Sequence, residues 1–148
     1  MSVYKSRRKD AAAEYIQAAR VLRIMTMRIV KRLPKSYHFV IGNKLLEMAS
    51  DIYTSSIKAN SIYMHAKMDK NDYDLRHRYT MKAFVTADAL EAEISFLYVM
   101  IDDGNNFFAN REDYTKKFKH WMEKAIETRN RLKVMLESDR KRFAGYSK

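Results

Sequence analysis

The sequence lacks cysteine altogether, and it has only one proline and three glycines among its 148 residues. Without cysteine the chain can form neither a disulfide framework nor a thiolate-ligated metal site. Proline and glycine are the residues that most often break helices, and both are scarce here. Ala, Leu, Met, Glu, Lys and Arg, all strong helix formers, are abundant. This composition predicts an all-α fold.

Long apolar runs are also missing. The first ten residues, MSVYKSRRKD, are charged where a signal peptide would need an apolar run of about seven residues. No stretch approaches the roughly eighteen consecutive apolar residues of a membrane span. We therefore expect no membrane association and a cytoplasmic location. With 47% hydrophobic residues, residues 1–148 are predicted to form a single domain around one core.

Four stretches of the sequence show the spacing of amphipathic helices, with apolar residues recurring at intervals of three and four. Pro34 should end the first helix, Ser36 should cap the second, and Gly104 should end the third. Four helices with short connections pack most simply as an antiparallel up-down-up-down four-helix bundle, in which the first and last helices are neighbours. The predicted helices span about residues 11–32, 37–68, 72–101 and 111–142.

The net charge of +11 is unevenly distributed along the chain. Residues 1–35 hold ten Lys/Arg and two Asp/Glu, residues 36–110 hold seven and ten, and residues 111–148 hold twelve and six. A bundle that places its first and last helices side by side would therefore carry a basic face, which predicts a polyanionic partner such as RNA or DNA. The candidate phosphate contacts are Arg20, Arg23, Arg28, Lys31, Arg32, Lys116, Lys119, Lys124, Arg131 and Lys133.

The first predicted helix carries a second apolar surface. Val21, Ile24 and Met27 fall among its cations rather than on the stripe that faces the core. A monomeric bundle would leave these side chains in water, whereas a contact between subunits would bury them. We therefore predict that they belong to an oligomer interface.

Catalytic and metal-binding patterns are weak. The histidines His38, His65, His77 and His120 are scattered, and neither a nucleophile elbow nor a phosphate-binding loop occurs. Five residues separate Arg32 from His38, as in small all-α ribonucleases of the HEPN type, but Pro34 between them breaks the helix that such a pair requires. We predict no metal, no cofactor and no enzymatic activity.

Several short segments carry a resemblance to a known family. The LPK turn, the Gly42-containing start of the second helix, the KLLEMASDIY run and the Ala59-Asn60 pair resemble the accessory variability determinant proteins of diversity-generating retroelements. These proteins are grouped with small four-helix proteins encoded in intervening sequences of bacterial large-subunit rRNA. The resemblance spans roughly residues 12–136.

This resemblance implies a homopentameric barrel of four-helix bundles with a basic surface. It also implies binding to nucleic acid and to the reverse transcriptase of the retroelement, in support of mutagenic reverse transcription and without catalysis by the protein itself. Two alternatives remain open. The first is an rRNA intervening-sequence protein, and the second is a helical interaction module whose basic face binds an acidic protein.

Overall fold

A computed structural model describes the backbone of residues 3–102 and 111–146, with the side chains of residues 14–101, 112–113 and 115–146. Within these ranges the chain is helical and contains no strand. A three-residue helix, α2, and a five-residue π-helix, η1, precede the second long helix. The elements are α1 (Val3–Val30), α2 (Lys35–Tyr37), η1 (His38–Gly42), α3 (Asn43–Ser61), α4 (Lys70–Asp102) and α5 (Arg111–Tyr146).

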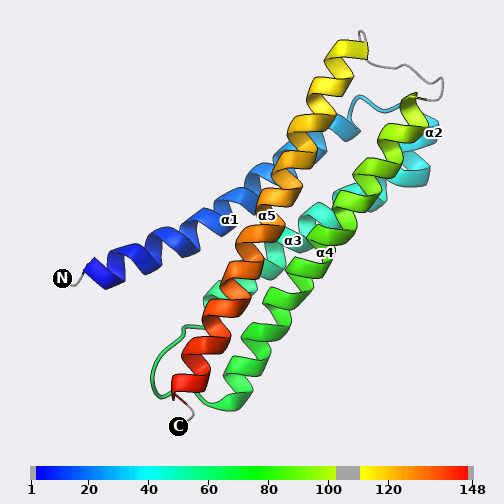
Figure 1. The fold of residues 1–148 in the computed structure, drawn as a ribbon. Coiled ribbons are helices and arrows are strands. Elements are labelled where there is room, and N and C mark those ends of the chain that lie inside the picture. Colours follow the sequence, from blue (N-terminus) through cyan, green and yellow to red (C-terminus); the bar gives the residue numbers. More distant parts are fainter. Residues whose placement is uncertain (1–2, 103–110, 147–148) are drawn as a thin grey trace.

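The four long helices form a closed ring of contacts, in which α1 packs against α3, α3 against α4, α4 against α5, and α5 against α1. Successive long helices run in opposite directions (Figure 1). The predicted antiparallel up-down-up-down four-helix bundle is therefore confirmed. Two consequences matter for function: α1 and α5 are neighbours, and α4 lies diagonally opposite α1.

The core is built from the predicted apolar stripes. Each long helix contributes side chains that are at most 2% exposed. They include Tyr15 and Leu22 on α1, Leu45 on α3, Leu90 on α4 and Leu132 on α5. A polar pair also lies in this core. Trp121 Nε1 donates a hydrogen bond to Thr26 Oγ1 at 2.9 Å, and the Thr26 hydroxyl donates to the Leu22 carbonyl at 2.7 Å. This bond joins α1 to α5 without leaving the indole N–H unpaired.

At one end of the bundle, polar groups from all four long helices meet in a cluster that we call the four-helix junction, made of Tyr15, Ser56, Arg76 and Asp139. Arg76 on α4 donates from Nε and Nη2 to the Asp139 carboxylate on α5, at 2.6 and 3.2 Å. Only 6% of Arg76 and 2% of Asp139 are exposed.

The other two helices join the same junction through a tyrosine. The Tyr15 hydroxyl on α1 donates to the Ser56 carbonyl on α3 at 3.2 Å. Burial raises the pKa of this hydroxyl to about 12, so that it stays a neutral donor at ordinary pH. The junction therefore satisfies its buried polar groups with partners from different helices.

The end of α3 differs from the prediction of a helix that reaches residue 68. The helix ends at Ser61, and Ile62 is extended, with φ −95° and ψ 103°. The physical reason is Arg76, whose Nη1 donates to the carbonyls of Ala59 and Ile62 at 3.2 and 2.7 Å. These carbonyls at the helix end are satisfied by a side chain rather than by a further turn of helix. Tyr63, which follows this break in the helix, is 68% exposed.

The other boundaries shift by smaller amounts. α1 begins at Val3 rather than near residue 11. It ends at Val30 because the Arg32 and Leu33 amides donate to carbonyls three residues back, as in a 3₁₀ turn, before Pro34. α4 begins at Lys70, where the Asp72 amide donates to Asp69 Oδ1 at 2.8 Å. α5 continues to Tyr146 rather than residue 142. Gly104, the predicted end of the third helix, lies outside the described residues.

The start of the second helical segment also differs from the prediction. Ser36 lies inside α2, whose N-cap is Pro34, and no side chain caps this end. Gly42 at the end of η1 approaches α1 closely, since a Cβ atom there would lie 3.0 Å from Val30 Cγ1. The absence of a side chain at Gly42 therefore allows the π-helix to pack against the buried end of α1.

Candidate nucleic-acid interface

The contact between α1 and α5 has a definite register. Arg32 near the end of α1 forms an ion pair with Asp113 at the start of α5, at 3.3 Å. Further along, Glu14 on α1 pairs with Arg131 on α5 at 2.8 Å. The two helices are therefore antiparallel neighbours, and the end of α1 lies level with the beginning of α5 (Figure 1).

This register gathers cations from both ends of the sequence at one end of the bundle. Within the described residues, none of these cations makes an ion pair, and all are exposed except the half-buried Lys117. We call the group the basic end, and it consists of Arg28, Lys31, Lys35, Lys116, Lys117 and Lys119. Glu112 and Asp113 in the first turn of α5 lie near these lysines but form no described ion pair with them, so the six cations still outnumber the carboxylates at this end, which is the strongest candidate for an anion-binding surface.

Four residues of the basic end were predicted from the sequence, and two were missed. Lys35 was missed because it follows Pro34 in what looked like a connection, whereas no signal in the sequence set Lys117 apart from its neighbours. The antiparallel register would have identified both, since it places the segment after α1 beside the first turns of α5.

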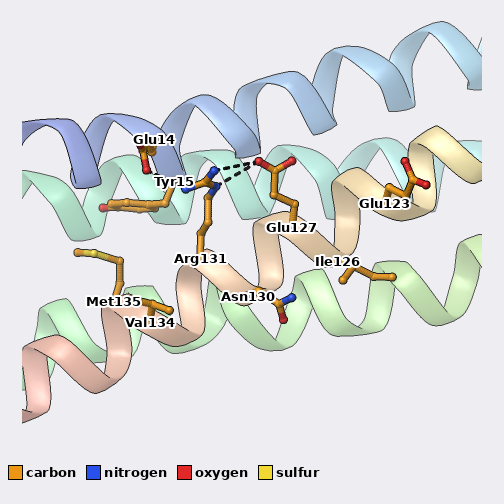
Figure 2. Close-up of a pocket in the computed structure, with 9 residues that line it drawn as sticks. All are labelled: Glu14, Tyr15, Glu123, Ile126, Glu127, Asn130, Arg131, Val134 and Met135. Carbon is orange, nitrogen blue, oxygen red and sulfur yellow. Dashed lines mark hydrogen bonds and ion pairs between the residues drawn. The ribbon is translucent and has the colours of Figure 1, made fainter.

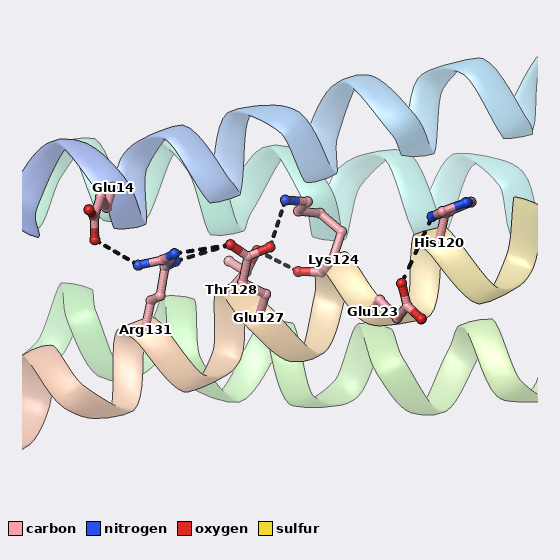
Figure 3. A network of polar contacts seen from close by, with 7 residues as sticks. All are labelled: Glu14, His120, Glu123, Lys124, Glu127, Thr128 and Arg131. Carbon is pink, nitrogen blue, oxygen red and sulfur yellow. Dashed lines mark hydrogen bonds and ion pairs between the residues drawn. The ribbon is translucent and has the colours of Figure 1, made fainter.

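The middle of the seam between α1 and α5 is balanced in charge (Figure 3). Lys124 Nζ donates to Glu127 at 2.6 Å, and Arg131 donates to Glu127 at 3.2 Å and to Glu14 at 2.8 Å. The hydrogen bond from Lys124, followed by that from Arg131, lowers the pKa of the Glu127 carboxyl. Lys124 and Arg131 are thus held by carboxylates, and the ten predicted cations do not form one continuous strip.

The remaining predicted cations lie apart from the basic end or are engaged. The Arg23 guanidinium is 5.6 Å from the centre of the Tyr53 ring and packs toward α3. Arg32 is held by Asp113. Arg20 and Lys133 are exposed but lie further along α1 and α5, away from the basic end.

The predicted oligomer residues on α1 differ in exposure. Val21 is half-buried and lines a hollow between α1 and α5 together with Glu127 and Arg131. Ile24 and Met27 are 37% and 46% exposed and lie on the outward side of α1. The role of these three residues in assembly stays a prediction.

A groove of about 540 Å³ runs between α1 and α5 beside the ion-pair network (Figure 2). Its apolar lining includes Tyr15 and Met135, and its charged lining residues are Glu14, Glu123, Glu127 and Arg131. Three of these four charges are negative, and the arginine already binds carboxylates. A phosphate would be repelled here, so the groove is not part of the candidate nucleic-acid interface.

No possible metal centre is found in the described part of the chain. Across the residues that the structure describes, no three His, Asp or Glu side chains come together in a possible metal site. Arg32 is paired with Asp113, and His38 opens η1 beyond the proline. No described helix is long and apolar enough to cross a bilayer.

Comparison with known proteins adds no relative, since no protein-family model, curated protein or solved structure matches the chain. The resemblance to accessory variability determinant proteins therefore stays a prediction, and the functional argument depends on charge and geometry.

Proposed function

We propose that this protein is a non-enzymatic accessory protein that binds RNA or DNA through its basic end. One observation carries the proposal. The antiparallel contact of α1 with α5 places Arg28, Lys31 and Lys35 level with three lysines of α5, and none of the six forms an ion pair in the described part of the chain. Such a surface attracts a polyanion by releasing the counterions that surround its phosphates.

The chemistry of these side chains suits contact with the phosphate backbone. Lys and Arg side chains on helix surfaces bind phosphates and fix the position of a nucleic acid, whereas discrimination of sequence needs groups that reach base edges. We therefore infer that binding depends little on base sequence. A protein of this kind suits a template RNA or its RNA–DNA product, which must be held whatever its sequence.

Following the resemblance, we further propose that the protein acts in the cytoplasm with the reverse transcriptase of a diversity-generating retroelement. In this role it supports mutagenic reverse transcription as a homo-oligomer, for which the resemblance implies five subunits. Copurification of the two proteins after nuclease treatment tests the contact with the reverse transcriptase, because bridging by RNA is then removed.

A charge-reversal pair of variants tests the basic end. The first variant replaces Arg28, Lys31, Lys116 and Lys119 by Glu. Its matched control replaces Lys67, Lys70, Arg140 and Lys141, which are exposed without a described ion pair at the opposite end of the bundle. Both variants change the net charge equally, so a difference between them reports position rather than total charge.

Fluorescence anisotropy of a labelled single-stranded RNA over a series of salt concentrations gives the measurement. For the wild type and the control we expect affinity to fall steeply with salt, and for the basic-end variant we expect the log–log slope to shrink by about 3. Equal binding by the two variants would contradict the proposal. Absence of RNA binding, with retained binding to an acidic protein, would favour the interaction-module alternative.

The same RNA also tests the absence of catalysis. We expect the labelled strand to remain uncut after incubation with wild-type protein and with His38→Ala. Cleavage by the wild type that disappears in the variant would instead identify a nuclease that uses His38.

A further inference from the structure

The outward face of α4 is apolar along most of its length, although the helix already buries its opposite face in the core. Val85 is 51% exposed and Phe96 is 58% exposed. Met81 and Met100 at the two ends of this face are 38% and 40% exposed. A continuous exposed apolar face of this kind is rare on a monomeric protein and marks a contact surface.

Six of the exposed residues on this face follow an order that is nearly the same when read from either end. It is Met81, Val85, Ala89, Ala92, Phe96 and Met100, with steps of four, four, three, four and four residues. The centre holds two exposed alanines, the next positions hold Val85 and Phe96, and the ends hold methionines. We call these six residues the α4 face.

A pattern of this symmetry is complementary to itself in one arrangement. When a second α4 lies antiparallel to the first, a twofold axis between Ala89 and Ala92 places Met81 opposite Met100 and Val85 opposite Phe96. In such an isologous contact both subunits use the same surface patch, as in a twofold dimer. The alanines at the centre permit close approach of the two helices, and the larger residues fill the space on both sides over about 29 Å.

We propose that the α4 face binds a second copy of this chain, with the two α4 helices antiparallel about a twofold axis. Phe96 then packs against Val85 of the other copy at two symmetric positions, and the alanines meet between them. The inference departs from the proposed function on one point, because it replaces the five subunits that the resemblance implies by two, and it holds whether or not the basic end binds nucleic acid.

The distribution of charge is compatible with a second copy on this face. The carboxylates of Asp88 and Glu91 are both paired with Arg129 of the same chain, and Glu93 is paired with Lys44 at 3.0 Å. The acidic groups beside the α4 face are thus neutralised within each subunit. Since α4 lies diagonally opposite α1, two chains of charge +11 can join here while the cations of α1 stay on the outside, where screening by salt is greatest.

The twofold contact also makes a prediction about subunit number. It joins copies in pairs, whereas a closed ring of five needs two different patches on every subunit. The α4 face therefore predicts a dimer in place of the five subunits that the resemblance implies.

Light scattering coupled to size-exclusion chromatography tests the dimer. We expect twice the chain mass of 17.6 kDa for the wild type and a single chain mass for Val85→Glu. Glu is a good helix former at an exposed position, and circular dichroism verifies that the fold is retained. The matched control is Val134→Glu, because Val134 is an equally small apolar residue, 63% exposed on α5, and should leave the dimer intact. A wild-type monomer, a wild-type pentamer or an unchanged mass for Val85→Glu would overturn the proposal.

Engineered cysteines test the register. The chain has no cysteine of its own, so Val85→Cys combined with Phe96→Cys introduces the only thiols. Eleven residues along one helix separate these thiols by about 16 Å, so they cannot pair within a chain. Oxidation should give a covalent dimer for the double variant and almost none for Val85→Cys alone. A dimer by mass that fails to cross-link would overturn the antiparallel register.

Measurement of RNA affinity on the same samples separates the two proposals. Val85→Glu leaves every residue of the basic end in place, so each monomer should still bind RNA with salt-dependent affinity. Loss of the dimer without loss of binding supports the α4 face as an assembly surface alone. Failure of RNA binding in the dimeric wild type would count against the basic end and not against the α4 contact.

Discussion

The two ends of the bundle use the same type of side chain in opposite ways. Arg76, at the four-helix junction, is 6% exposed and binds the Asp139 carboxylate and two backbone carbonyls. Arg28, at the basic end, is exposed and has no described ion pair. The difference shows that an arginine stabilises the fold or stays open to a partner according to the carboxylates that other helices bring beside it.

This comparison predicts that stability and binding are separable along the bundle. Removing one partner of a buried ion pair lowers the free energy of unfolding strongly, because an uncompensated charge stays behind in the interior. Removing one partner of an exposed pair lowers it only slightly, because water solvates the remaining charge. Changes at the junction should therefore alter the free energy of unfolding and leave the basic end intact.

The largest expected effect is that of Asp139→Ala. This change leaves the buried Arg76 guanidinium without its carboxylate, and we expect the free energy of unfolding to fall by about 3–5 kcal/mol. Urea denaturation followed by circular dichroism measures it. Asp113→Ala is the control, because the Arg32–Asp113 pair is about a third exposed and should contribute less than about 1 kcal/mol. Equal losses in the two variants would contradict the distinction between the ends.

An intermediate effect is expected for Trp121→Phe, between the two ends. The variant loses the hydrogen bond to Thr26 and leaves a small cavity, which should lower the free energy of unfolding by about 1–3 kcal/mol. A double-mutant cycle with Thr26→Val isolates the hydrogen bond, for which we expect a coupling of about 1 kcal/mol. Strict additivity of the two changes would show that this bond adds nothing to the α1–α5 contact.

The smallest effect is expected in the charge-balanced seam. Because the pKa of Glu127 is lowered by folding, its ionised form stabilises the protein above the unfolded value of 4.5, and this contribution disappears as the pH falls through the lower folded pKa. Since Glu127 is more than a third exposed, we expect less than about 1 kcal/mol. Thermal melts at pH 7 and pH 3 should differ slightly less for Glu127→Gln than for the wild type. An unchanged difference would mean that the network has no linkage to pH.

The sequence predicted the bundle because periodicity depends only on neighbours along the chain. Leu22, Leu90 and Leu132 fall on stripes spaced by three and four, and all three are buried. The predicted end of α3 was wrong because the residue that ends the helix, Arg76, comes later in the sequence and reaches back to Ala59 and Ile62. Contacts made through tertiary structure leave no local pattern in the sequence.

The same limit explains the candidate interface. The pairing of Lys124 with Glu127 follows helical spacing and could have been anticipated, since residues three apart are neighbours on a helix. The pairing of Arg131 with Glu14 could not, because the two residues are 117 positions apart. Composition therefore located the basic helices correctly, while the distinction between paired and unpaired cations needed coordinates.

The position of Arg76 also has a consequence for motion. It fastens the ends of α3 and α5 to the start of α4, so local opening at that end requires three helices to separate together. Deuterium uptake should accordingly be slowest around Ala59 and Asp139 and fastest in η1 and the first turns of α5. The end that carries the free cations would then adjust to the curvature of a bound strand while the opposite end preserves the fold.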